Sequence, residues 1–401
     1  MVERAAMPHY GAVSSRADLP STPPRFAGRG AFTRELEAET TAYFEGSGRA
    51  RRDSPRMYVK GVVMMAWLAG SWTLLVFGAR NSVEATLCAL SVGLAIAGIG
   101  MSVQHDGNHG AASKHAWVNR LFGCGLDFMG VCSFIWRQKH NICHHTFTNI
   151  QGVDHDLDFG SLARLSPEQP RRPWHRWLHL YLWFFYGFLL PKWVFHDDFV
   201  VLRSRYIGGH ALTPPSRAKL VAFTGWKIFF VMWAIAIPAL FHPLWQVLVF
   251  HLVACFALGA TLGTVFQLAH CTRDAEFPAV TPGRNMGEWS VHQLATTVDF
   301  GRSNPILTWF VGGLNFQVEH HLFPKVSHVH YPALSRIVER LAEKHGLQYR
   351  SQASFFGAVV AHLAHLRDLG RPVVEPVVVA SSVTRHATTL AMGGLEIDAG
   401  E

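Results

Sequence analysis

Charged residues are scarce in this chain. Lys, Arg, Asp and Glu make up only 16% of its 401 residues, whereas 49% are hydrophobic and 12% are aromatic. This composition is unusual for a soluble protein and indicates a membrane protein with a sizeable water-facing part. The net charge of +8 favours an anionic membrane face over nucleic acid as the partner, because so few charges are available to contact phosphates.

Paired cysteines and a secretory signal are also missing. None of the six cysteines forms a CxxC pair, so we expect reduced packing residues in a cytosol-facing protein, not disulfides. The first 30 residues are rich in Pro, Arg and Ser and contain no apolar run, which argues against a signal peptide. We expect residues 1–30 to be disordered, residues 31–371 to form the membrane domain and residues 372–401 to be a loose tail.

Four apolar segments are long enough to cross a hydrocarbon core of roughly 30 Å. Between them, joints at 80–82 and 242–243 are too short to hold a domain, which predicts two helical hairpins. The four segments are residues 57–79, 83–103, 220–241 and 244–268.

Two more apolar stretches, residues 117–136 and 176–195, contain polar side chains such as Arg120 and Asp127. A charge at the bilayer centre costs about 2.5–3.5 kcal/mol, so we expect interfacial or half-buried helices there. Residues 31–47 fit a short amphipathic helix ended by glycine.

The number of spans is even in either case, so all polar segments fall on one side of the membrane. Basic residues flank the first span, and the positive-inside rule places that side in the cytoplasm. The sequence therefore predicts an all-α integral membrane protein of the inner membrane. It has four transmembrane helices in two hairpins, interfacial helices, and a cytosolic helical cap with both termini on the cytoplasmic side. The basic residues are Arg49, Arg51, Arg52, Arg56 and Lys60.

Histidine is abundant, with 24 residues, and much of it is ordered in three motifs. HDGNH and HNICHH each place two histidines four residues apart, which puts both imidazoles on one helical face. In QVEHH, Gln317 precedes two adjacent histidines by three and four residues, so all three side chains can face one centre. A further histidine ends the fourth span, on the same membrane face. The histidines concerned are His105, His109, His140, His144, His145, His270, His320 and His321.

Three spaced clusters of histidine are hard to explain except as metal ligands, although a lone histidine is usually a surface or hydrogen-bonded residue. Imidazole suits iron, zinc, copper and nickel. A closed structural zinc site needs four ligands, so eight histidines are enough for two metals. Too few carboxylates lie in the clusters for the Glu-rich di-iron bundles. Redox chemistry favours iron, while the spacing alone leaves the metal open.

Several residues near the motifs have two readings. Acidic side chains there either accept the second N–H of a ligating imidazole or are ordinary solvated acids. His292 lies in no motif spacing, so we expect a packing or supporting role, with a ninth ligand as the alternative. The basic residues beside the motifs either meet phosphates of a lipid or coenzyme A or only orient the chain. The acids are Asp106, Asp154, Asp156, Asp158 and Glu319, and the basic residues are Arg137, Lys139 and Lys325.

The motifs HDGNH, HNICHH and QVEHH resemble the three histidine boxes of integral-membrane fatty acid desaturases. The order of the boxes and the hydrophobic hairpins match as well, and the resemblance continues through VHQLATTVDF and WFVGGLNFQVEHHLFPKVSHVHYPAL. It is similar to the bacterial acyl-CoA or linoleoyl-CoA-type branch and covers roughly residues 31–350.

The resemblance implies a di-iron centre that activates O2 and removes two hydrogens from an acyl chain carried by coenzyme A or a lipid. It implies the box histidines as ligands, and His270 matches an extra histidine that many members place before the last box. Gln317 stands where other branches have histidine, as in front-end desaturases, which add a double bond between an existing one and the carboxyl end. HPGG, the motif of a fused cytochrome domain, does not occur here. We therefore expect a separate ferredoxin or cytochrome-type electron donor with its reductase.

Two other functions fit parts of the pattern. A hydroxylase built on the same boxes would capture the substrate radical with oxygen, and sequence separates it poorly from a desaturase. A membrane metal transporter would place histidines inside its spans. Here His251 is the only clear one within a span, which favours the desaturase.

Overall fold

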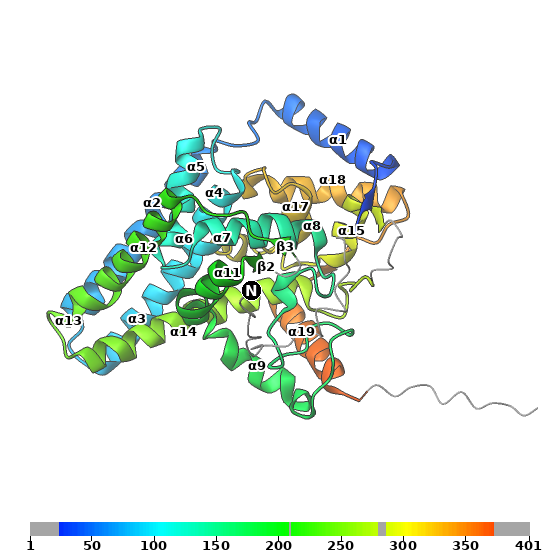
Figure 1. Ribbon diagram of the computed structural model, residues 1–401. Helices are drawn as coiled ribbons and strands as arrows, with labels where there is room; N and C mark the ends of the chain where they lie inside the picture. Colours follow the sequence, from blue (N-terminus) through cyan, green and yellow to red (C-terminus); the bar gives the residue numbers. More distant parts are fainter. Residues whose placement is uncertain (1–23, 208–209, 280–285, 373–401) are drawn as a thin grey trace, which may run out of the picture. The chain divides into compact units, whose positions relative to one another are not determined.

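The computed structural model describes residues 24–207, 210–279 and 286–372, and these residues are mostly helical (Figure 1). Four continuous helical rods are long and apolar enough to cross a membrane, which confirms the four expected spans. Their ends differ from the predicted ones by up to six residues, the largest difference being the second rod, which continues through the first histidine motif to His109. The rods are Pro55–Gly78, Ser82–His109, Arg217–Ala239 and Leu244–His270.

Three of the rods contain π-helical turns. The first is α2 (Pro55–Thr73) and η1 (Leu74–Gly78), and the fourth is the single helix α14 (Leu244–His270). The second and third rods change type twice. They consist of α3 (Ser82–Gly98), η2 (Ile99–Gln104) and α4 (His105–His109), and of α12 (Arg217–Val231), η7 (Met232–Ala236) and α13 (Ile237–Ala239).

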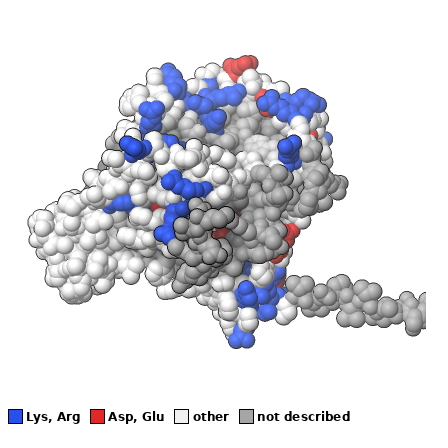
Figure 2. Space-filling model, viewed as in Figure 1, with Lys and Arg blue, Asp and Glu red and all other residues white. Residues whose placement is uncertain are grey.

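The outer surfaces of these rods are apolar. Val62, Leu87 and Val221 are 70%, 61% and 73% exposed, an arrangement that suits contact with lipid tails. Figure 2 shows the same pattern, since the end of the bundle that carries α13 is almost free of coloured charges, whereas Lys and Arg gather over the opposite end. The α3 helix is the most enclosed of the four rods and packs against α2 and α14.

The contact between α3 and α14 depends on a glycine. A Cβ at Gly93 would lie 2.3 Å from the carbonyl oxygen of Ala254, so the two backbones approach too closely for any side chain. We expect Gly93→Ala to force the helices apart and to destabilise the protein by about 1–3 kcal/mol. Gly70 of α2 has no atom within 4 Å of such a Cβ, so Gly70→Ala is the matched control. Thermal unfolding in detergent measures both, and equal midpoints for the two variants would contradict the close approach.

The two ambiguous stretches form short helices separated by bends. The first is bent by 113° between Ala116–Phe128 and Ser133–Phe147, and whether it lies at the interface stays a prediction. Its elements are α5 (Ala116–Gly123), α6 (Gly125–Phe128), α7 (Ser133–Arg137), η3 (Gln138–His144) and α8 (His145–Phe147). The second contains α9 (Leu178–Tyr186), α10 (Leu189–Lys192), η6 (Trp193–Asp197) and α11 (Asp198–Ser204).

The remaining helices lie at the end of the bundle where the histidine motifs meet. The predicted helix 31–47 is confirmed as α1 (Ala31–Ser47), which ends at Gly48 with a φ of 62° and packs on α18. The other elements are η4 (His155–Leu157), η5 (Pro173–Trp177), α15 (Trp289–Thr296), α16 (Pro305–Phe310), α17 (Gln317–Leu322), η8 (His328–His330), α18 (Tyr331–Lys344) and α19 (Phe355–Gly370).

Three short strand pairs tie loops together. The parallel pair of β1 (Phe26–Ala27) with β4 (Met286–Glu288) gives residues 24–30 a fixed path, so this part of the expected disordered N-terminus is ordered. The expected disorder of residues 1–23 and the loose tail at 373–401 lie outside the described residues. The other pairs are β2 (Tyr206–Ile207) with β3 (His210–Ala211) and β5 (Asp299–Phe300) with β6 (Ser351–Gln352).

Candidate metal centre

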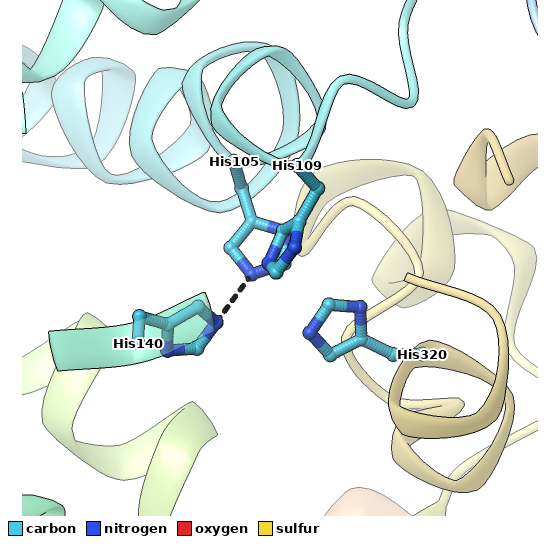
Figure 3. A group of neighbouring side chains, drawn as sticks. All are labelled: His105, His109, His140 and His320. Carbon is cyan, nitrogen blue, oxygen red and sulfur yellow. Dashed lines mark hydrogen bonds between the residues drawn. The ribbon is translucent and has the colours of Figure 1, made fainter. Parts of the chain in front are cut away.

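The first group of histidines is built from three separate segments. Its ligand nitrogens all lie within 4.8 Å of one another, and all four residues are buried. Two come from α4, directly after the π-helical turn η2, and the others from η3 and α17 (Figure 3). Nitrogens bound to one ion at about 2.1 Å lie up to about 4.2 Å apart, so small movements would close this group around a metal. The four residues are His105, His109, His140 and His320.

A second group adjoins the first. His144, His270 and His321 also place their ligand nitrogens within 4.8 Å of one another. His145 lies between the two groups, because its ligand nitrogen is that close to those of His320 and His321, and its Nε2 is 3.2 Å from Nε2 of His140. All eight predicted histidines therefore come together, in two adjoining groups with His145 close to a member of each.

Equal spacing in the sequence does not give equal placement. His105 and His109 in the α-helix α4 join the same group, as expected. In the π-helix η3, His140 belongs to the first group and His144 to the second, and their ligand atoms also lie within 4.8 Å of each other and of Asp156. His320 and His321 lie in one group with His145, since the three ligand nitrogens are within 4.8 Å of one another, while His320 also adjoins the first group and His321 the second. Whether Gln317 shares that centre stays a prediction.

Several buried polar atoms of the centre have no partner among the described residues. They include Nε2 of His109, His320 and His321, Nδ1 of His145 and Oε1 of Gln317. A buried polar group without a hydrogen bond costs about 1–3 kcal/mol, so this many together calls for a ligand. Neutral imidazole nitrogens are good iron ligands, and the residues present fit a two-metal centre.

Four of the histidines outside the spans favour the neutral form. Burial, followed by the proximity of other histidines, lowers the pKa of His140, His145, His320 and His321 well below the ordinary 6.5. A neutral ring keeps the lone pair that a metal needs.

This depression predicts how the metal-free protein responds to acid. In the unfolded chain each of these histidines binds a proton near pH 6.5, whereas in the folded chain it stays neutral at that pH. The free energy of unfolding is therefore highest above pH 6.5 and decreases as the pH falls below it. The loss is about 1.4 kcal/mol per pH unit for each such histidine. We expect the thermal midpoint of the metal-free protein to fall steeply from about pH 7 to about pH 5. A flat profile would show that the histidines are already protonated in the folded state.

The carboxylate of Asp154 contacts Nδ1 of His144, one of the candidate ligands. Oδ2 of Asp154 lies 3.0 Å from Nδ1 of His144 and also accepts from the backbone N–H of Asn149. Burial opposes a charged ring, but Asp154 raises the pKa of His144 above its ordinary value. Asp156 lies 3.6 Å from the same nitrogen and pairs with Lys139 at 3.0 Å. Asp154 therefore contacts a motif histidine, one of the two roles that the sequence left open, whereas Asp156 lies within 4.8 Å of the ligand nitrogens of His140 and His144.

Two other acids lie elsewhere. Asp106 accepts a hydrogen bond from Nδ1 of His328 at 2.9 Å, and Nε2 of His328 lies 2.9 Å from Nζ of Lys60. Asp106 therefore stabilises the fold next to His105 and does not contact a ligating histidine ring. Glu319 accepts from the hydroxyl of Tyr349 at 3.0 Å. Burial, and then the neighbouring Asp299, raise the pKa of Glu319 well above its ordinary value.

The last two predicted supporting residues also lie away from the ligand nitrogens. The ring centre of His292 is 5.1 Å from that of Phe26, which fits the expected packing role. Asp158 accepts from the backbone N–H of Gly160 at 2.9 Å, an ordinary turn contact.

Sequence reasoning missed three residues that orient ligands. Oε1 of Gln293 accepts from Nδ1 of His321 at 2.8 Å, and the hydroxyl of Tyr331 lies 3.3 Å from Nδ1 of His320. Trp136 stacks on His140 with ring centres 4.3 Å apart. Gln293 and Tyr331 lie in the stretches that extend the resemblance, but no spacing rule marks them. Only their folded positions reveal what they contact.

A cavity of about 80 Å³ adjoins both groups. Gln317 lines it together with His105, His140, His144, His270 and His320, so Gln317 lies beside the histidines of both groups. Apolar walls come from residues such as Trp136 and Phe266, and the rim carries Lys139 and Lys192. Apolar side chains and ligand nitrogens therefore line one cavity.

Comparison with known proteins defines the class. The family model described as fatty acid desaturase matches residues 82–353, and the chain belongs to that family. It is an enzyme, an oxidoreductase that desaturates fatty acyl chains. The chain is 36% identical over 340 residues to the sn-1 linoleoyl-lipid 6-desaturase of Arthrospira platensis, covering 84% of this chain and 92% of the relative.

Two more relatives cover similar shares of the chain. The sn-1 linoleoyl-lipid 6-desaturase of Synechocystis is 33% identical over 86% of this chain and 98% of the relative. The acyl-lipid (8-3)-desaturase of the moss Physcomitrium patens is 33% identical over 84% of this chain and 71% of the relative. The resemblance deduced from the histidine motifs is therefore confirmed.

Proposed function

We propose that this chain is a front-end acyl-lipid desaturase with two iron ions per chain. It adds a cis double bond between an existing double bond and the carboxyl end of a lipid-bound acyl chain. The observation that carries the proposal is the meeting of eight histidines in two adjoining groups with His145 close to a member of each. The named activities of the relatives, which act at the carboxyl side of acyl lipids, support the position of the new bond.

The reaction balances with oxygen as the oxidant. A –CH2–CH2– unit, O2, two electrons and two protons give –CH=CH– and two molecules of water. Bound iron supplies the O2 activation that breaks unactivated C–H bonds, which no side chain can do by acid–base chemistry. The electrons come from a separate ferredoxin or cytochrome-type donor and its reductase.

The side chains of this protein then have three tasks. The eight histidines hold the irons, and Asp154, Gln293 and Tyr331 fix the orientation of three of them through Nδ1. Gln317 lies in the cavity wall and is a weaker candidate ligand through Oε1. The aromatic walls exclude water and hold the acyl chain beside the irons.

The membrane arrangement follows from the same site. Residues 31–371 form the desaturase domain, with the four spans arranged as two hairpins and the histidine groups in a cytosolic cap. The active site and both ends of the domain face the cytoplasm of the inner membrane. The basic residues around Arg49 support this orientation, and a membrane-bound acyl lipid reaches the site from the bilayer.

Expression in a host that takes up linoleic acid tests the proposal. Gas chromatography with mass spectrometry compares the fatty acids of membranes that contain the intact protein or the His320→Ala variant. We expect a new acid with an additional double bond on the carboxyl side of the existing ones, only with the intact protein, and within intact lipids.

Other products would revise the proposal in defined ways. A hydroxy acid would replace the desaturase by a hydroxylase, and a bond on the methyl side would remove the front-end assignment. A product found only on coenzyme A would change the acyl carrier. No product in a host that supplies reduced ferredoxin and cytochrome, from protein that contains two irons, would overturn the proposal.

A further inference from the structure

The cavity beside the histidines has an acidic lining, although the chain as a whole has a net charge of +8. Two lysines and four aspartates line it, which gives these residues a net charge of −2. Most of this charge lies on the solvent side, because the side chains of Lys192 and Asp156 are 45% and 35% exposed, whereas the histidines are buried. The rim of the cavity comprises Lys139, Lys192, Asp156, Asp158 and Asp197, and Asp154 lies deeper.

Both lysines of the rim are already paired with an acid. Nζ of Lys139 lies 3.0 Å from Oδ1 of Asp156. Nζ of Lys192 lies 2.7 Å from each carboxylate oxygen of Asp197. A phosphate that reached the rim would therefore have to displace a carboxylate from each lysine.

The other basic residues that the sequence offered as phosphate contacts do not line the cavity. Arg137 donates to Oδ1 of Asn108 at 3.0 Å, and Lys325 lies outside the lining. The sequence left open whether these residues bind phosphates or only orient the chain. Their positions in the structure argue against a phosphate site at this cavity.

Asp158 is the acid of the rim without a cation. Its Oδ1 accepts from the backbone N–H of Gly160, and within the described residues no Lys or Arg forms an ion pair with it. Two further polar atoms of the lining, Nδ1 of His155 and Oε1 of Gln317, are buried and have no partner among the described residues. The cavity thus offers unused acceptors at its rim and unpartnered polar atoms further in, which together call for a bound polar group.

A front-end reaction brings the headgroup of the substrate to this rim. The reacting carbons lie only a few bonds from the carboxyl ester, so the headgroup stays close to the cavity while those carbons lie beside the ligand nitrogens. Charges in a partly buried place are screened less than charges in open water. A headgroup with excess negative charge is repelled by the acids and finds no free cation, whereas ammonium and hydroxyl groups donate to carboxylates.

We propose that the rim selects acyl lipids whose headgroup has no net negative charge and offers hydrogen-bond donors. It discriminates against anionic phospholipids and against coenzyme A thioesters, and Asp158 accepts from the headgroup. The proposal rests on the function proposed above and adds the class of headgroup. Ethanolamine phospholipids and glycosylated diacylglycerols share the required chemistry. The selection comes mainly from repulsion of the wrong headgroups, a common source of specificity.

Competition for the rim tests the proposal without requiring turnover. The intact purified protein in a neutral detergent receives a trace of linoleoyl phosphatidylethanolamine with a diazirine beside the ester. After illumination and digestion, we expect label on peptides that contain residues 154–159 or 192–197. Unlabelled linoleoyl phosphatidylethanolamine or monogalactosyldiacylglycerol should suppress the label at least about tenfold more effectively than linoleoyl phosphatidylglycerol or linoleoyl-CoA. The stronger of the two neutral competitors shows whether ammonium or hydroxyl is the preferred donor.

Two substitutions change the charge of the rim. Asp197→Asn removes the partner of Lys192 and leaves a cation for a phosphate, so we expect phosphatidylglycerol to become a severalfold better competitor. Such a gain cannot come from a protein that has failed to fold. Asp158→Asn keeps an acceptor for Gly160 but loses the charge, and it should weaken competition by phosphatidylethanolamine. Glu168→Gln is the matched control, since Glu168 is exposed and does not line the cavity.

The possible outcomes separate this proposal from the proposed function. Equal competition by neutral and anionic lipids, stronger competition by phosphatidylglycerol or linoleoyl-CoA, or no competable label on these peptides would overturn it, even if the enzyme makes its product. An unchanged preference in both Asp197→Asn and Asp158→Asn would overturn it as well. The expected preference would support it even if no product forms, and the proposed function alone would then fail.

Discussion

Replacing His145 by alanine should remove both irons and abolish desaturation. His145 lies next to both histidine groups, since its ligand nitrogen is within 4.8 Å of that of His320 in the first group and of His321 in the second. Its loss opens both groups at once, and the effect should exceed the roughly 10–100-fold loss that follows removal of an outer-shell partner. Elemental analysis of the purified protein measures the iron, and the fatty acid profile measures the activity.

Two further variants sharpen this prediction. His270→Ala affects only the second group, so we expect that protein to keep more iron than His145→Ala while losing activity. His115→Ala is the control, because His115 is exposed at the start of α5 and belongs to neither group. If His145→Ala retained iron as well as His115→Ala does, the position of His145 next to both groups would be wrong.

Asp154→Asn should weaken iron binding at the second group by about 10–100-fold. The Asp154 carboxylate accepts from Nδ1 of His144 and from the N–H of Asn149, so it fixes both the ring and the turn behind it. An amide in its place keeps the size but loses the charge, and His144 becomes a poorer donor to the metal. Titration of the metal-free protein with Fe²⁺ measures the affinity of each site.

Asp368→Asn provides the comparison for this variant. Asp368 pairs with Arg273 on the surface, and its side chain is 40% exposed, so the same change of charge occurs far from the ligands. We expect wild-type iron affinity for it. Equal affinities for Asp154→Asn and the wild type would mean that the carboxylate holds the loop but does not tune His144.

The histidines that come together were predictable from the sequence because each motif carries its own signal. Adjacent histidines and spacings of four residues are visible without a structure, and four apolar runs predict the spans. The grouping was not predictable, because it depends on how α4, η3, α14 and α17 pack against one another. No spacing within one motif marks which histidines of the other motifs it will meet.

The supporting residues divide in a similar way. Asp154 and Asp156 lie shortly after the second motif, so closeness in the chain predicted closeness in space. Gln293 reaches His321 from a separate helix, and only tertiary packing brings the two together. Asp106 shows the converse, because it follows a ligand directly but points to His328. Neighbouring residues of a helix point in different directions, so adjacency alone does not make a supporting residue.

The metal content of the purified protein tests the centre most directly. The account predicts two iron ions per chain in protein expressed with adequate iron. His105, His109, His140 and His320 should be required for one ion, and His144, His270 and His321 for the other. Inductively coupled plasma mass spectrometry with amino-acid analysis gives the ratio. A single ion per chain, or zinc that persists when iron is supplied, would contradict the two-iron centre.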